Sequence, residues 1–116
     1  MKGWHLMLDG KVQKELLWDH HYLYDLMQKI CKRIKMKALT PPYLVHAHLP
    51  KNHPRAGITG IMVIEYSHIS IHTFPNKDGH LMIDVFSCKK FDMEGLAKYL
   101  LKELKMKEPK IRMIER

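Results

Sequence analysis

The sequence has few cysteines and no long hydrophobic stretch. Its 116 residues include two cysteines, Cys31 and Cys88, too few for the disulfide framework of a small secreted protein. No apolar run approaches the roughly eighteen residues that span a bilayer. The first ten residues, MKGWHLMLDG, lack the sustained apolar stretch and cleavage site of a secretory signal. Without repeats, low-complexity tracts or linkers, we expect a single cytoplasmic domain over residues 1–116 that has no contact with a membrane.

Acidic residues are scarce relative to basic ones. Lysine and arginine total 20 and aspartate and glutamate 12, which gives a net charge of +8. Such an excess is a feature of nucleic-acid-binding proteins. Here, however, lysines concentrate in residues 29–37 and 102–110, where they alternate with apolar residues as on the solvated face of an amphipathic helix. Aromatic residues are not interleaved with them as a base-stacking platform requires. The pattern therefore does not favour a nucleic acid as partner.

Hydrophobic periodicity predicts an α+β fold. Asp19 suits the N-cap of a helix that runs to about Met36, and Asp92 that of a second helix to about Lys105. Apolar runs predict strands at 3–9, 43–49, 58–65, 68–74 and 80–87, with a short last strand at 111–114. Neighbouring strands joined by short turns pair antiparallel. We therefore predict a two-layer sandwich, an antiparallel β-sheet with two helices packed on one face.

Residues 65–75, EYSHISIHTFP, bring together side chains suited to catalysis. Ser67 is a nucleophile and His72 a proton carrier, while Cys88 ends the next strand as a second acid-base group. Because side chains alternate along a strand, Ser67 and His72 would face opposite sides unless the chain bends near Tyr66. The simpler interpretation is that these polar residues are the outer face of an exposed strand and that Cys88 is a small hydrophobe.

Nine histidines raise the question of a metal site. His46 and His48 lie two apart on a predicted strand, and His20 and His21 are adjacent at a helix start. Two histidines on one face are only half a site, and no cysteine pair or HExxH motif completes it. We therefore predict no metal.

Two segments resemble the processing region of the short prokaryotic S-adenosylmethionine decarboxylases: residues 57–75, GITGIMVIEYSHISIHTFP, and residues 83–88, IDVFSC. That family carries GVSG at a strand entry, then ESHLTIHTWP, and an IDxFTC strand end. Looser similarity covers most of the chain, at His5-Leu6, Trp18-Asp19 and His46. The resemblance implies a proenzyme of spermidine and other polyamine biosynthesis that cuts itself between Tyr66 and Ser67 and forms a homodimer of cleaved protomers.

The resemblance also implies a role for each residue of this region. Ser67 would attack the preceding carbonyl to give an ester, and β-elimination would turn it into a covalent pyruvoyl cofactor that forms a Schiff base with the substrate. Such a carbonyl accepts electrons as CO2 leaves S-adenosylmethionine. His72 would be the acid-base group of processing, and Thr59 stands where the family has a serine that helps the same step. Cys88 would return a proton to the product carbon, which suits a thiol.

The sequence departs from the family at positions that would hold the substrate. Tyr66 stands where the family usually has a glutamate directly before the serine, and Glu65 lies one position earlier. Asn76 stands where the family has a glutamate that holds the ribose hydroxyls. His48 is the nearest match to a family phenylalanine that stacks on adenine. An amide can bond to a diol and an imidazole can stack on a purine, so these four stay candidate substrate-binding residues. The departures leave open the same chemistry on arginine or ornithine, whose cationic tail would need a carboxylate from Glu65, Asp84 or Asp9. A non-enzymatic alternative is a small basic binding domain that has lost processing.

Overall fold

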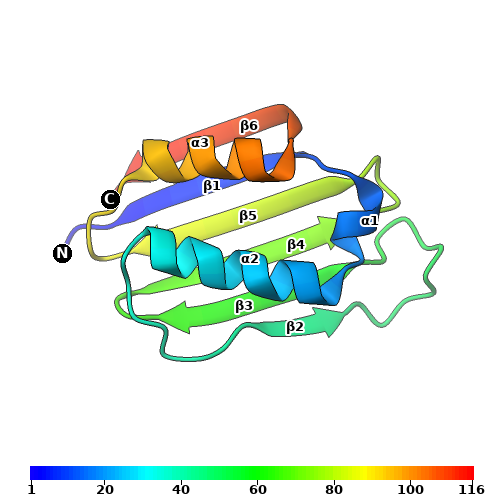
Figure 1. Cartoon of the computed structure of the whole chain (residues 1–116), viewed down its shortest axis with the longest axis horizontal. Coiled ribbons are helices and arrows are strands. Elements are labelled where there is room, and N and C mark those ends of the chain that lie inside the picture. Colours follow the sequence, from blue (N-terminus) through cyan, green and yellow to red (C-terminus); the bar gives the residue numbers. More distant parts are fainter.

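A computed structural model describes all residues, 1–116, as six strands and three helices (Figure 1). The elements follow in the order β1 (Trp4–Lys11), α1 (Lys14–Leu17), α2 (His20–Arg33), β2 (Tyr43–His46), β3 (Ile58–Ile64), β4 (Ser67–Phe74), β5 (His80–Ser87), α3 (Met93–Leu104) and β6 (Lys107–Glu115). None of the three helices has the length and the apolar composition that spanning a membrane requires.

The strands form one antiparallel sheet in the order β2-β3-β4-β5-β1-β6. Helices α2 and α3 lie on the same face, α2 against the β2–β3 side and α3 against β1 and β6 (Figure 1). The predicted α+β two-layer architecture is confirmed.

Both predicted N-caps are present. The Asp19 carboxylate accepts a hydrogen bond from the Tyr22 N–H at 3.0 Å, and the Asp92 carboxylate accepts one from the Gly95 N–H at 2.9 Å. Helix α2 nevertheless ends at Arg33, not near Met36, because Lys35 adopts a left-handed conformation with φ of 58°.

Three further elements differ from the prediction. Strand β2 ends at His46, so His48 lies beyond the strand and the two histidines do not share a strand face. The single turn of α1 is an additional helix, too short for periodicity to reveal. Strand β6 is longer than residues 111–114, because it pairs with β1 from Lys107 to Glu115. All nine of its residues are exposed, so no alternation of buried residues marks it in the sequence.

The core lies between the helices and one face of the sheet. Every second residue of the central strands is buried there, including Ile69, Ile71, Ile83 and Val85. The residues between them point to the other face, which no helix covers and which we call the open face. In β3, β4 and β5 it carries Thr59, Ile61, Val63, His68, Ser70, His72, Phe74, His80, Met82, Asp84 and Phe86.

Candidate active site

The turn between β3 and β4 places Ser67 at the start of a strand and bends the chain directly before it. Ile64 pairs with Ser67, which leaves Glu65 and Tyr66 as a two-residue turn. Tyr66 has a φ of 61°, in the left-handed region that a residue with a Cβ adopts only at a cost. The chain therefore bends at Tyr66, and the bend strains the residue that precedes Ser67.

The peptide bond between Tyr66 and Ser67 is surrounded by specific contacts. The half-buried Ser67 hydroxyl donates to the Glu65 carbonyl at 2.8 Å, and its Oγ lies 2.9 Å from the Met36 Sδ. The Tyr66 carbonyl accepts the Cys88 N–H at 2.9 Å. An N–H donor aimed at a carbonyl stabilises negative charge that develops on its oxygen. The main chain of Cys88 is thus fixed beside this bond, and Cys88 is exposed to solvent.

Thr59 and His72 form a second pair, on the open face. They are directly opposite each other in the β3–β4 register, and Thr59 Oγ1 lies 3.1 Å from His72 Nδ1. Gly57 allows β3 to begin this close to β4, because a Cβ there would collide with the Thr73 carbonyl. The Thr73 hydroxyl in turn accepts the Ile58 N–H at 2.9 Å. These contacts fix the register that sets Thr59 against His72.

Within one protomer, Ser67 and the Thr59–His72 pair are far apart. Along β4 the Ser67 side chain lies on the same side of the sheet as the buried residues and faces the helices, whereas the His72 side chain lies on the open face. Five residues of strand separate their Cα atoms by about 16 Å. The structure therefore brings Thr59 to His72 and Cys88 to Tyr66, but it does not bring His72 to Ser67.

The candidate substrate-binding residues are dispersed. The Asn76 amide donates to the Lys51 carbonyl at 2.7 Å and to the His53 carbonyl at 3.0 Å, so both of its amide hydrogens hold the β2–β3 loop. His48 is exposed in that loop. Only Glu65 and Tyr66 adjoin Ser67. The loop contacts of Asn76 had no signal in the sequence, because its partners are main-chain atoms.

The candidate carboxylates for a cationic tail also differ in their surroundings. Asp84 lies on the open face, with its Oδ1 3.8 Å from His5 Nε2, a buried nitrogen without a hydrogen bond. Asp9 lies near the far end of the same face, opposite Met82. Glu65 has no ion-pair partner within 4 Å and is the one next to Ser67.

A group of aromatic and histidine rings lies beside the turn and was not predicted from the sequence. The Phe86 ring meets the edge of the His5 ring at 5.8 Å and lies 5.6 Å from the His68 ring. The Arg116 guanidinium lies over Phe86 at 4.9 Å. Alternation along each strand could have placed His5, His68 and Phe86 on one face, but their adjacency depends on strand order.

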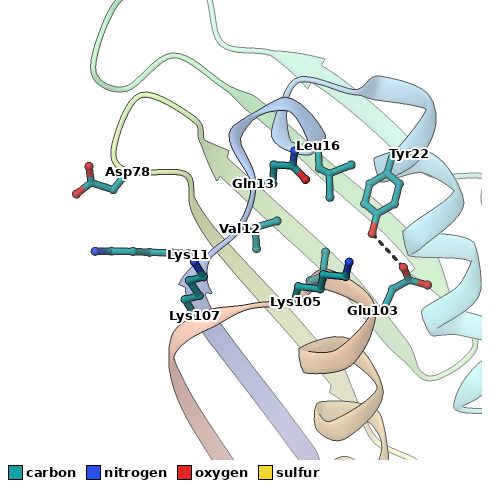
Figure 2. Close-up of a pocket in the computed structure, with 10 residues that line it drawn as sticks. Lys11, Val12, Gln13, Leu16, Tyr22, Asp78, Glu103, Lys105 and Lys107 are labelled. Carbon is teal, nitrogen blue, oxygen red and sulfur yellow. Dashed lines mark hydrogen bonds between the residues drawn. The ribbon is translucent and has the colours of Figure 1, made fainter.

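One cavity lies away from all of these residues. It has a volume of about 590 Å³ and opens where α1, the end of α3 and the start of β6 meet (Figure 2). Inside it the Tyr22 hydroxyl donates to Glu103 at 3.3 Å, and burial together with the Glu103 charge raises the pKa of Tyr22 to about 12. No predicted site residue lines it.

No group of three or more histidine, cysteine, aspartate or glutamate side chains is arranged to hold a metal ion.

Comparison with known proteins identifies the family. A family model described as S-adenosylmethionine decarboxylase matches residues 4–116. An S-adenosylmethionine decarboxylase proenzyme from Clostridium botulinum (strain Langeland) is 31% identical over 116 residues, 98% of this chain and 93% of that protein. The proenzyme from Pyrococcus furiosus is 40% identical over 52 residues, 44% of this chain and 37% of that protein.

A solved structure has the same fold. The crystal structure of the adenosylmethionine decarboxylase from Aquifex aeolicus superimposes with a TM-score of 0.79 at 22% identity, covering 98% of this chain and 89% of that chain. Together with the match over nearly the whole sequence, these similarities show that the chain belongs to the S-adenosylmethionine decarboxylase family.

Proposed function

We propose that the chain is a self-processing, pyruvoyl-dependent decarboxylase of S-adenosylmethionine. Membership of a family of decarboxylases and the names of its relatives support the reaction and the substrate. The observation that best supports self-processing is the 2.9 Å hydrogen bond from the Cys88 N–H to the Tyr66 carbonyl. This carbonyl belongs to the bond that Ser67 would cleave.

In the first step the Ser67 Oγ bonds to the Tyr66 carbonyl carbon. The bond from that carbon to the Ser67 nitrogen breaks, and the hydroxyl proton ends on the freed amine, which leaves an ester. Negative charge develops on the Tyr66 oxygen during the attack, where the Cys88 N–H stabilises it. The left-handed conformation of Tyr66 raises the energy of the uncut chain and so favours cleavage.

In the second step a base removes the proton on the Cα of residue 67, and the Cβ–O bond breaks. The chain separates into fragments 1–66 and 67–116, and hydrolysis releases ammonia to leave the pyruvoyl group. The surroundings fit this group, because pairing with Ser87 keeps residue 67 in the sheet beside Cys88. A pyruvoyl carbonyl supplies an electron sink for decarboxylation. The Cys88 thiol holds the proton that the product carbon needs.

The base in this proposal is His72, and it would come from a second copy of the chain. The separation of about 16 Å along β4 excludes His72 of the same protomer. The open face exposes apolar residues beside the predicted site residues, such as Ile61 at 47% and Val63 at 44%. Clustered exposed apolar side chains mark protein interfaces. We therefore propose a homodimer whose open faces meet, with Thr59 orienting His72.

Intact mass of the purified protein tests self-processing. The wild-type chain should give fragments 1–66 and 67–116, the second blocked to N-terminal sequencing, whereas Ser67→Ala should stay whole. One unbroken 13.8 kDa chain after long incubation would contradict the proposal and favour the non-enzymatic binding domain.

Coexpression of two inactive variants tests the role of the second copy. Ser67→Ala keeps His72, and His72→Ala keeps Ser67, so each alone should remain uncut. When the two carry different tags and are purified as a mixed dimer, only the His72→Ala chain should be cleaved. Cleavage of His72→Ala by itself, or an uncut mixed dimer, would rule out action across the dimer.

Release of CO2 from S-adenosylmethionine, arginine and ornithine, measured side by side on the cleaved protein, tests the substrate. We expect activity on S-adenosylmethionine. Release from arginine or ornithine alone would instead support the basic amino-acid alternative, with Glu65, two residues before Ser67, as the candidate carboxylate for the cationic tail.

A further inference from the structure

The segment that follows α2, residues 34–40, lies along the turn before Ser67. The Leu39 N–H donates to the Val63 carbonyl at 3.0 Å, and the Glu65 N–H donates to the Lys37 carbonyl at 2.8 Å. An isolated antiparallel β-bridge between Ala38 and Ile64 lies between these two hydrogen bonds, so the segment holds the end of β3 and the turn in place.

Met36 is the residue of this segment that reaches the Ser67 side chain. Its Sδ lies 2.9 Å from Ser67 Oγ and 3.6 Å from Ser87 Oγ, and the residue is only 7% exposed. Its carbonyl accepts the Cys31 thiol at 3.0 Å, which fixes the main chain of Met36 as well. The thioether is therefore held against the hydroxyl from the core side.

The Ser67 hydroxyl is confined between two neighbours. It has one proton to donate, and the Glu65 carbonyl at 2.8 Å is a stronger acceptor than a thioether. The Met36 sulfur then limits rotation about the Ser67 Cα–Cβ bond, which otherwise has three staggered positions. An attacking atom must be held close to its target in one orientation for rapid reaction.

We propose that Met36 is a positioning residue for self-cleavage: its thioether holds the Ser67 Oγ in the orientation from which it attacks the Tyr66 carbonyl carbon. In that step the Oγ–C bond forms, the bond from Tyr66 C to Ser67 N breaks, and the hydroxyl proton passes to the freed amine. The inference rests on the self-processing proposed above. It adds a residue 31 positions before Ser67 to the processing machinery.

Met36→Leu tests this role, with Met62→Leu as the matched control. Both changes replace a buried methionine by an apolar residue of similar volume, and Met62 is 2% exposed on β3. Of these two methionines, only Met36 is a hydrogen-bond partner of the Ser67 hydroxyl. If the hydroxyl becomes free to occupy all staggered positions, Met36→Leu should cleave about threefold to tenfold more slowly than wild type. Met62→Leu should stay within about twofold of wild type.

Two further measurements separate positioning from stability. Hydroxylamine cuts ester bonds, so the fraction of fresh chain that it cleaves should fall in Met36→Leu and not in Met62→Leu. The unfolding temperatures of both variants, measured in the Ser67→Ala background, should be similar. Equal cleavage rates for wild type and Met36→Leu, or equal slowing by Met62→Leu, would overturn the positioning role alone. A wild-type chain that never cuts itself would overturn the proposed function as well.

Discussion

Strain at Tyr66 should accelerate the cleavage that follows it. A residue with a Cβ in the left-handed region costs about 1–2 kcal/mol, and glycine avoids that cost. Tyr66 sits there with φ of 61° in the uncut chain, and cutting the next peptide bond releases it. If the strain is relieved in the transition state, Tyr66→Gly should slow cleavage by about fivefold to thirtyfold.

The matched control is Tyr66→Phe. It keeps the Cβ and the ring and removes only an exposed hydroxyl, so cleavage should proceed at the wild-type rate. Tyr66→Asn should fall between Phe and Gly, because asparagine tolerates the left-handed region better than tyrosine while keeping a side chain. The assay is the appearance of fragments 1–66 and 67–116 over time on a denaturing gel.

The order of the three variants decides between strain and flexibility. Rates that fall from Phe through Asn to Gly would support release of strain. If Asn cleaves as fast as Phe and only Gly is slow, the loss arises from added chain flexibility. Equal rates for all three would refute the contribution of Tyr66 conformation.

Three further outcomes follow from the contacts described. Cys88→Ala keeps the main-chain N–H that contacts Tyr66, so the chain should still cut itself, while decarboxylation should fall by about 10²-fold or more. Fragment yield measures the first effect and CO2 release the second. An uncut chain would contradict the separation of the two roles of Cys88. Thr59→Val removes the hydroxyl that lies 3.1 Å from His72 and should slow cleavage by about tenfold. Thr59→Ser keeps a hydroxyl and should cleave at the wild-type rate. An undiminished cleavage rate in Thr59→Val would exclude the orienting role of Thr59. Because the pKa of Tyr22 is raised to about 12, its contribution to stability is fully present below its ordinary value near 10 and is lost as pH rises toward 12. Urea unfolding from pH 9 upward should therefore show a steeper alkaline loss for wild type than for Tyr22→Phe, and parallel curves would contradict the raised pKa.

Local signals in the sequence were sufficient for most of the elements. Asp19 and Asp92 precede amphipathic segments, and each carboxylate caps its helix through an N–H three residues later. The alternation of buried residues in β4 and β5 is visible without any structure. Exposed β6 had no such pattern, because its pairing with β1 is a contact between the two ends of the chain.

The contacts of the candidate site depend on residues far apart in the sequence. Met36 reaches Ser67 across 31 positions, and Asn76 reaches the loop carbonyl of Lys51 across 25. Neither pairing leaves a periodic signal, because each depends on how a loop folds back on the sheet.

The sequence by itself determined the chemical groups and the faces on which they lie. Because side chains alternate along a strand, the spacing of five residues put Ser67 and His72 on opposite sides of β4. Tertiary structure alone decided which groups meet. Strand register set Thr59 opposite His72 and brought the Cys88 N–H to the Tyr66 carbonyl, since pairing between distant strands is fixed by turn geometry and by which faces are buried.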